Sequence, residues 1–238
     1  MEVAIVTVGD ELLAGDIENT NATWLAEQLT DRGVDVRRVI VLPDVREIIT
    51  EHVREYSDSF DAVIVTGGIG GTPDDITMAA VAAAFDLPLV EHAAAREDIE
   101  ATVARLRERY PDWELDVDIA AEASLPEGAE LLLNDEGLSP GCILENVFVF
   151  PGIPEEMRAM FRTVAETFDG SLHSRTVYTD IPESDLVSHL QAVRAEFDLT
   201  VGCYPNKGEG QNRIKLTGTD RTRIDDAATW LSERLEEG

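Results

Sequence analysis

The sequence is poor in cysteine and in lysine. Its two cysteines, Cys142 and Cys203, lie in different segments and have no metal-ligand spacing. This excludes a scaffold built on disulfides and argues against a zinc site. We therefore expect both thiols to serve as small, buried apolar side chains. Only two of the basic residues are lysines, Lys207 and Lys215.

Positive charge is scarce throughout the chain. Lys and Arg total 19 against 48 Asp and Glu, which gives a net charge of −29 over 238 residues. Because no basic stripe is present to neutralise phosphates, we expect no nucleic-acid partner. A surface this acidic repels itself in dilute salt, and concentrated salt screens that repulsion. We interpret the acidity as halophilic, a property of the habitat rather than of the function.

The chain also lacks long hydrophobic runs, and we do not expect its first apolar segment to be a signal peptide. No run reaches the length of a transmembrane helix. Residues 2–8 are an apolar stretch of strand length that ends in Gly9-Asp10-Glu11, and no basic segment precedes it. We expect a soluble, cytoplasmic protein without a membrane partner.

Several catalytic and cofactor motifs are absent as well. The four histidines are scattered and no Gly-x-Ser-x-Gly occurs, so Ser-His-Asp catalysis has no support. The glycine-rich segment 67–72 lacks the Gly-x-Gly-x-x-Gly spacing of dinucleotide-binding domains. No lysine follows it to form a P-loop, which leaves the role of these glycines to be explained differently.

The dominant feature that is present is a strand that runs directly into glycines and acids. Residues 62–65 are apolar and predict a buried strand, glycines follow at 67, 68, 70 and 71, and Asp74 and Asp75 precede a helical pattern. Glycines let backbone N–H groups approach a ligand, and a helix start favours phosphate. Carboxylates beside phosphate require a cation between them, so the segment predicts a metal–phosphate site. The alternative is an Asp that caps the helix after a tight turn.

The order of patterns predicts an α/β fold. Strands at 2–8, 34–42 and 62–65 alternate with helices, a loop is expected at 9–15, and Asn19 or Asn21 is positioned to cap the first helix. Asp44 lies three residues before Glu47, which is the spacing of a capping box. This alternation predicts a mostly parallel sheet covered by helices on both faces, a three-layer α/β/α architecture.

A change in periodicity divides the chain after about residue 170. Residues 141–144 and 147–150 predict two short strands, and Pro154 starts a helix. Beyond a linker at 169–171 the pattern becomes strand, helix, strand, strand, helix. We predict a domain over 1–170 and a small α+β module over 171–238.

Loops that follow parallel strands meet at one edge of a sheet. Oxygen ligands gathered there suit Mg²⁺ or a similar hard cation. The loops concerned are 9–11, Asp44, 66–77 and 139–141.

Two blocks in this set resemble a known family. They are Gly9-Asp10-Glu11-Leu12-Leu13-x-Gly15 with Asn19-Thr20-Asn21, and Thr66-Gly67-Gly68-x-Gly70-x-Thr72-x-Asp74-Asp75-x-Thr77. They are similar to the molybdopterin-binding (MogA/MoaB-like) domain, and within it to the amino-terminal domain of competence/damage-inducible protein A. Segments 126–129, 139–141 and 150–155 extend the resemblance. The carboxyl module resembles the region that follows this domain in eukaryotic FAD synthase.

The resemblance implies a ligand, a metal and a set of site residues. Family members bind molybdopterin or nucleotides, and some cleave ADP-ribose or FAD with a divalent metal, so we expect a metal-dependent nucleotide pyrophosphatase. The alternative is a molybdopterin- or nucleotide-binding module without turnover. A homo-oligomer is expected. The catalytic candidates are Asp10, Asp44 and Asp75, the metal candidates are Asp74 and Asp75, and the ligand-binding candidates are Gly9, Glu11, Asn19, Asn21, Thr66, Gly67, Gly68, Gly70, Thr72, Thr77, Pro140, Gly141 and Lys215.

The carboxyl module contains an unusual concentration of cations. Lys207, Arg213 and Lys215 lie close together in a chain that has few bases. One hypothesis is that they reach a phosphate or nucleotide. The other is a solvated hairpin whose cations pair with nearby acids such as Glu209.

Overall fold

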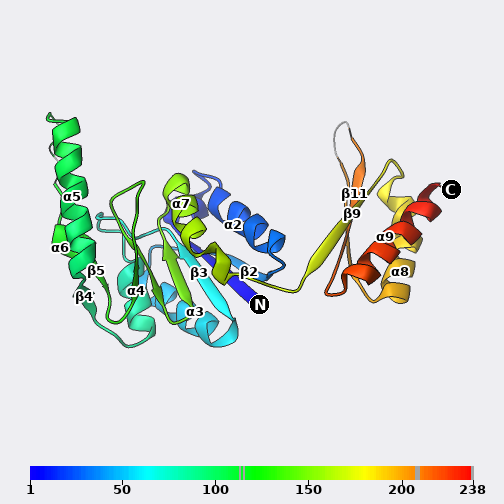
Figure 1. The fold of residues 1–238 in the computed structure, drawn as a ribbon, viewed down its shortest axis with the longest axis horizontal. Coiled ribbons are helices and arrows are strands. Elements are labelled where there is room, and N and C mark those ends of the chain that lie inside the picture. Colours follow the sequence, from blue (N-terminus) through cyan, green and yellow to red (C-terminus); the bar gives the residue numbers. More distant parts are fainter. Residues whose placement is uncertain (113, 115, 207–209, 237–238) are drawn as a thin grey trace. The chain divides into compact units, whose positions relative to one another are not determined.

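The computed structural model describes residues 1–112, 114, 116–206 and 210–236, so Lys207 and Glu209 lie outside the described residues. The chain separates into two compact units, Met1–Asp169 and Gly170–Gly238 (Figure 1). Within the described ranges, no helix is long and apolar enough to cross a bilayer.

The first unit is built on a six-stranded sheet in the order β2-β1-β3-β8-β7-β6. Strands β2, β1, β3 and β8 run parallel, and β7 is antiparallel to both of its neighbours. Strands β4 and β5 form a separate pair. The strands are β1 (Glu2–Val8), β2 (Asp35–Leu42), β3 (Ala62–Thr66), β4 (Leu89–Glu91), β5 (Ser124–Pro126), β6 (Glu130–Leu132), β7 (Gly141–Leu144) and β8 (Val147–Phe150).

Helices cover both faces of this sheet. The helices of the unit are α1 (Asp10–Ala14), α2 (Thr20–Asp31), α3 (Arg46–Ser59), α4 (Thr77–Ala84), α5 (Ala93–Arg109), α6 (Ile119–Glu122), α7 (Pro154–Val164) and the 3-10 turn Ala165–Thr167. Alternate residues of β1 belong to two cores: Val3 and Ile5 pack with α2 and α7, whereas Val6 and Val8 pack with α3 and α4. The predicted three-layer, mostly parallel α/β/α fold is confirmed.

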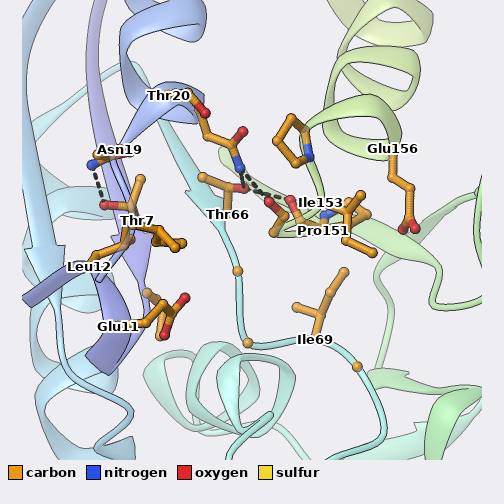
Figure 2. Close-up of a pocket in the computed structure, with 18 of the residues that line it drawn as sticks. Thr7, Glu11, Leu12, Asn19, Thr20, Thr66, Ile69, Pro151, Ile153 and Glu156 are labelled. Carbon is orange, nitrogen blue, oxygen red and sulfur yellow. Dashed lines mark hydrogen bonds between the residues drawn. The ribbon is translucent and has the colours of Figure 1, made fainter. Parts of the chain in front are cut away.

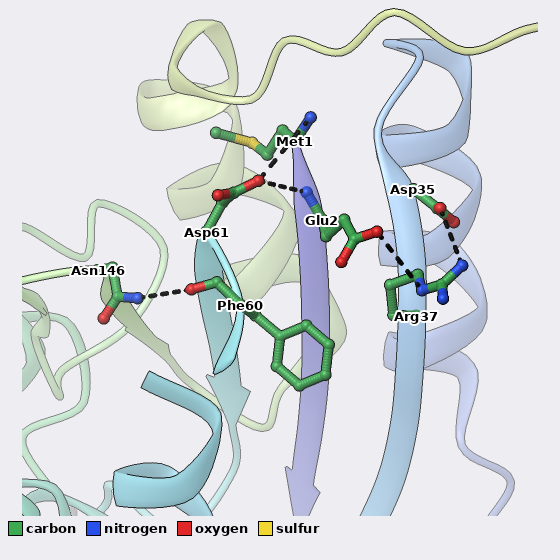
Figure 3. Close-up of polar contacts among 7 residues, drawn as sticks. All are labelled: Met1, Glu2, Asp35, Arg37, Phe60, Asp61 and Asn146. Atoms are coloured by element: carbon green, nitrogen blue, oxygen red, sulfur yellow. Dashed lines mark hydrogen bonds and ion pairs between the residues drawn. The ribbon is translucent and has the colours of Figure 1, made fainter. Parts of the chain in front are cut away.

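The amino ends of the strands are joined by polar contacts (Figure 3). The Asp61 carboxylate accepts a 2.7 Å hydrogen bond from the Glu2 N–H and lies 3.9 Å from the terminal ammonium of Met1. Arg37 pairs with Glu2 at 3.7 Å, and Asn146 donates to the Phe60 carbonyl at 3.0 Å. These contacts tie β1, β2 and β3 together at the edge opposite to the predicted site.

Two local predictions and one alternative were wrong. Segment 9–15 is not simply a loop, because Asp10–Ala14 form the short helix α1, which ends at Gly15 with φ 76°. Asp44 does not cap α3, which follows Val45 and has no side-chain cap. The Asp44 carboxylate accepts the Asp10 N–H at 2.8 Å instead. Helix α4 likewise follows Ile76 without a side-chain cap, so the capping interpretation of Asp74 and Asp75 fails.

Two predictions on individual side chains had mixed outcomes. Asn19 does cap α2, since its side chain accepts the Ala22 N–H at 3.1 Å. Cys142 is fully buried, and burial raises the pKa of its thiol to about 12. Cys203, on a strand of the second unit, is only partly buried, so the prediction of a buried thiol holds only in part there.

The second unit contains a three-stranded antiparallel sheet in the order β10-β11-β9. Its elements are β9 (His173–Thr179), α8 (Glu183–Phe197), β10 (Thr200–Tyr204), β11 (Asn212–Gly218) and α9 (Arg221–Glu236), in the predicted order. Val177, Ile214 and Leu216 of the sheet pack with both helices in a core of their own.

Candidate functional site

A cleft opens at the carboxyl ends of the parallel strands. The strand order is β2-β1-β3. The chain adds β2 on one side of β1 and later adds β3 on the other side, so the loops that follow β1 and β3 diverge from each other. Crevices at such points bind ligands in open α/β sheets. The cleft has a volume of about 490 Å³. Figure 2 shows Thr7 and Glu11 on one side of it, Thr66 and Ile69 centrally, and Ile153 and Glu156 on the other side.

Glycines form the floor of the cleft at the end of β3. Gly67 and Gly68 have φ of 101° and 65°, which residues with a Cβ rarely adopt. A Cβ on Gly67 would lie 2.3 Å from the Val8 carbonyl oxygen. Thr77 holds the loop from α4: its hydroxyl donates to the Gly67 carbonyl at 2.8 Å, and its N–H donates to the Gly68 carbonyl at 2.8 Å.

We expect Gly67→Ala to destabilise the first unit strongly, because the methyl group meets backbone that cannot move aside. The matched control is Gly15→Ala, where φ is 76° and no atom lies within 4 Å of the added Cβ. The control should cost about 1–2 kcal/mol of backbone strain, and Gly67→Ala at least about 2 kcal/mol more. Urea denaturation measures both free energies of unfolding. Equal losses would contradict the tight packing of this loop.

Two asparagines connect α2 to the strand ends. Asn19 donates to the Thr7 hydroxyl at 2.9 Å. Asn21 donates to the Gly152 carbonyl at 2.7 Å and to the Thr66 hydroxyl at 3.4 Å. Within the described part of the chain, the buried Oδ1 of Asn21 has no hydrogen-bond partner. An unsatisfied buried acceptor at a cleft wall suits a ligand that brings a donor.

The carboxylates divide between the cleft and its rim. Asp75 lines the cleft, and its Oδ2 accepts the N–H of Thr72 at 2.9 Å and the hydroxyl of Thr72 at 2.6 Å. The carboxylate packs against Gly70, where a Cβ would lie 2.7 Å from Oδ2. Asp74 is exposed at the rim of the cleft.

Asp10 and Asp44 form a pair beside the glycine loop. Each carboxylate accepts the other residue's N–H, at 2.8 and 3.4 Å. Asp44 Oδ1 would lie 3.6 Å from a Cβ on Gly68. Partial burial raises the pKa of the Asp44 carboxyl, and the charges of Asp10, Glu11 and Asp74 add to this, against the opposing hydrogen bond from the Asp10 N–H.

Only some of the residues predicted for the site line the cleft. Eight of them line the cleft: Glu11, Asn19, Asn21, Thr66, Gly67, Gly68, Gly70 and Asp75. Thr72 and Pro140 border a smaller adjoining cavity of about 290 Å³ that also contacts Asp75. Gly9 donates to the Leu42 carbonyl at 3.1 Å, and Gly141 is buried in β7, where a Cβ would meet Met160. Lys215 belongs to β11 in the second unit.

Sequence reasoning missed the wall that β8 and α7 provide. This wall includes Pro151, Gly152, Ile153, Pro154 and Glu156. Segment 150–155 is part of the family resemblance, but its sequence pattern alone does not indicate a binding site. The adjacency of β8 to β3, which places this loop at the same edge, was the missing information.

Glu156 is the half-buried acid of this wall. It accepts a 2.7 Å hydrogen bond from Asn134, yet burial raises the pKa of its carboxyl, with the charges of Glu155 and Glu136 adding to the shift. A raised pKa in the folded state means that this group favours folding below its unfolded pKa, and that this contribution is lost as the pH rises through the folded value.

Glu156→Gln should therefore be more stable relative to the wild type at pH 7 than at pH 4.5. Thermal melts of both proteins across this range measure the difference. Glu166→Gln, at an exposed position, is the control and should show a flat difference. A gap for Glu156→Gln that widens on acidification would contradict the raised pKa.

The fold and the cleft define an α/β domain with a candidate ligand-binding cleft at the carboxyl ends of its parallel strands. A family model described as a probable molybdopterin binding domain matches residues 4–169. The chain belongs to this molybdopterin-binding (MogA/MoaB-like) family, as the resemblance predicted. Residues 171–238 match a second model, described as the middle domain of FAD synthase.

Individual relatives extend the match to the whole chain. A protein of Archaeoglobus fulgidus is 36% identical over 239 residues, covering 100% of this chain and 99% of its own. A CinA-like protein of Synechococcus sp. is 37% identical over 99% of this chain, which spans only 56% of that relative's length. The crystal structure of CinA from Thermoplasma acidophilum, described as having unknown function, superposes with a TM-score of 0.61 at 28% identity, covering 71% of this chain and 99% of its own.

Proposed function

We propose that the first unit is a metal-dependent nucleotide pyrophosphatase that cleaves ADP-ribose-like or FAD-like dinucleotides at the pyrophosphate. The observation that carries the proposal is the meeting of a left-handed glycine loop and the Asp75 carboxylate in one cleft. The N–H groups of Gly67 and Thr72 already donate to the Phe150 carbonyl and to Asp75, so the backbone N–H groups of the segment 68–71 bind the phosphates, because glycines allow the closest approach.

The residues beside the loop fit a hard divalent cation such as Mg²⁺. Burial raises the pKa of Asp44, the charges of Asp10, Glu11 and Asp74 add to the shift, and a bound cation would relieve this excess of negative charge. Among the residues that the structure describes, no three His, Cys, Asp or Glu side chains form a ready-made metal cage. Mg²⁺ commonly uses one or two carboxylates together with the phosphates of its substrate. We propose that Asp74 and Asp75 supply the carboxylates.

The cation would offset the negative charge that develops on the pyrophosphate. The protein's own contribution is to orient the reactants. Thr72 positions Asp75 through two hydrogen bonds, and the reciprocal bonds between Asp10 and Asp44 fix both carboxylates. Asp44, whose Oδ1 faces Gly68, or Asp10 would orient the attacking water.

The apolar walls of the cleft provide room for a ring. Leu12, Ile17 and Ile153 line it, and Ile17 and Ile153 are more than half exposed. Exposed aliphatic side chains beside a polar floor suit a planar base, flavin or pterin. This observation also supports the second candidate, a pterin- or nucleotide-binding module of molybdenum-cofactor metabolism that does not turn its ligand over.

FAD distinguishes the two candidates. With Mg²⁺ or a similar cation present, the pyrophosphatase releases FMN and AMP, which chromatography separates from FAD. A binding module retains intact FAD or a pterin under the same conditions. Binding without any FMN would overturn the proposal and favour the second candidate.

A further inference from the structure

The sheet of the second unit has one face that its helices leave uncovered. Helices α8 and α9 lie on the same side of the sheet (Figure 1). They bury Val177, Ile214 and Leu216, and Arg175 of β9 reaches Asp225 of α9 on that side at 3.5 Å. Because side chains alternate along a strand, the residues between these point to the opposite face.

Strand pairing arranges this open face in three rows. The rows, taken across β10, β11 and β9, are Tyr204–Arg213–Tyr178, then Gly202–Lys215–Thr176, then Thr200–Thr217–Ser174. None of these nine residues is acidic, although the chain contains 48 acids. The face carries two cations, so it attracts anions while the remainder of the chain is strongly acidic.

Tyr204 forms a flat platform on this face. A Cβ on Gly202 would lie 2.9–3.1 Å from its ring and hydroxyl atoms, so the ring lies over the glycine. The Arg213 guanidinium is 5.9 Å from the ring centre. Tyr204 is 50% exposed and Tyr178 is 59% exposed, which leaves both rings open to a stacking partner.

We propose that this open face binds a free nucleoside phosphate, because its two cations suit one phosphate group and the net charge of −29 on the chain disfavours a polyanionic strand. The base stacks on Tyr204 or Tyr178, and the phosphate binds Arg213 and Lys215. The dimensions agree. Adjacent strands are about 4.8 Å apart and alternate residues along one strand are about 6.8 Å apart, so the distance from a tyrosine ring to a cation is similar to the distance from the base to the phosphate of one nucleotide. A base stacks on an aromatic ring and a phosphate pairs with neighbouring cations, so this face offers a partner to each part of the nucleotide.

Charge complementarity and the two rings together select this occupant. An acidic peptide would use the cations but offers no ring to the exposed tyrosines, and a second copy that docked by the same face would bring its own cations against these cations. A nucleoside phosphate uses both the cations and the rings.

Photoaffinity labelling of the full chain tests the site. The probes are 8-azidoadenosine 5′-phosphate and a twelve-residue oligoadenylate that carries one 8-azidoadenosine, both used with a chelator so that no turnover occurs. We expect labelled peptides that contain Tyr204 or Tyr178. Arg213→Met with Lys215→Met should reduce this labelling at least tenfold. Arg175→Met with Arg221→Met removes the same charge from other positions and should leave it unchanged, and circular dichroism confirms that each variant is folded.

The competition arms identify the source of the nucleotide. Unlabelled AMP that competes as well as the oligonucleotide supports a free nucleotide, whereas an oligonucleotide effective at tenfold lower concentration than AMP would assign the face to a single strand and would overturn the proposal. Labelling confined to residues 1–169, or undiminished in the Arg213 and Lys215 variant, would overturn it. Absent labelling together with a dimer that dissociates in this variant would assign the face to a second copy and would also overturn it.

Discussion

Asp75→Asn is expected to lower the rate of AMP release more than a hundredfold while the protein remains folded. The asparagine oxygen can still accept the Thr72 N–H, which the Asp75 carboxylate accepts at 2.9 Å. The substitution removes the negative charge that faces the cleft, and an amide is a poor ligand for a hard cation. A loss of several kcal/mol of transition-state stabilisation corresponds to more than about a hundredfold in rate. Steady-state assays at saturating divalent cation measure this change.

Asp58→Asn is the matched control for this substitution. Asp58 is an exposed acid of α3, and removing its charge should leave the rate within about twofold of the wild type. Turnover comparable to that of the wild type in the Asp75 variant would contradict the assignment of Asp75 as a metal-binding carboxylate. A variant that fails to fold would show that the Thr72 contacts, rather than the charge, are what the position provides.

The second large effect is a rise in thermal stability with salt. We propose that the protein is halophilic. Folding places a net charge of −29 on a compact surface, where the like charges repel one another. The screening length falls from about 10 Å at 0.1 M salt to about 3 Å at 1 M, which removes most repulsion between exposed acids. A gain of about 4 kcal/mol would raise Tm by about 10 °C in a chain of this size. Melts in 0.1 M and 1 M KCl measure the shift.

The pH separates screening of charge from other effects of salt. Near pH 4 about half of the Asp and Glu side chains are protonated, so the salt dependence should shrink markedly there. A Tm that stays flat or falls with KCl at pH 7 would reject the halophilic interpretation. A shift of equal size at both pH values would attribute the stabilisation to something other than the acidic surface.

The elements that carry periodic apolar residues were predictable from the sequence. Strands β1, β3, β7 and β8 and the element order of the second unit follow from patterns that burial imposes directly. The convergence of the loops that follow Val8 and Thr66 follows from parallel pairing, and Glu11, Asn21, Gly67 and Asp75 do line one cleft.

Features that depend on tertiary pairing could not be predicted. Asp44 has the local spacing of a capping box, but a backbone N–H from Asp10, distant in sequence, takes its carboxylate instead. Glu156 has an ordinary position on an amphipathic helix, and only the packing of α7 beside Asn134 half-buries it. Short strands such as β5 and β6 are three residues long, which is too short for a period to be recognised.

Release of AMP from ADP-ribose is the measurement that tests the central claim most directly. We predict that the purified chain with a divalent cation converts ADP-ribose to AMP and ribose 5-phosphate, that excess chelator stops the reaction, and that the restored cation restarts it. ADP-ribose that binds in the presence of the cation but is recovered intact would contradict the pyrophosphatase and leave a binding module in its place.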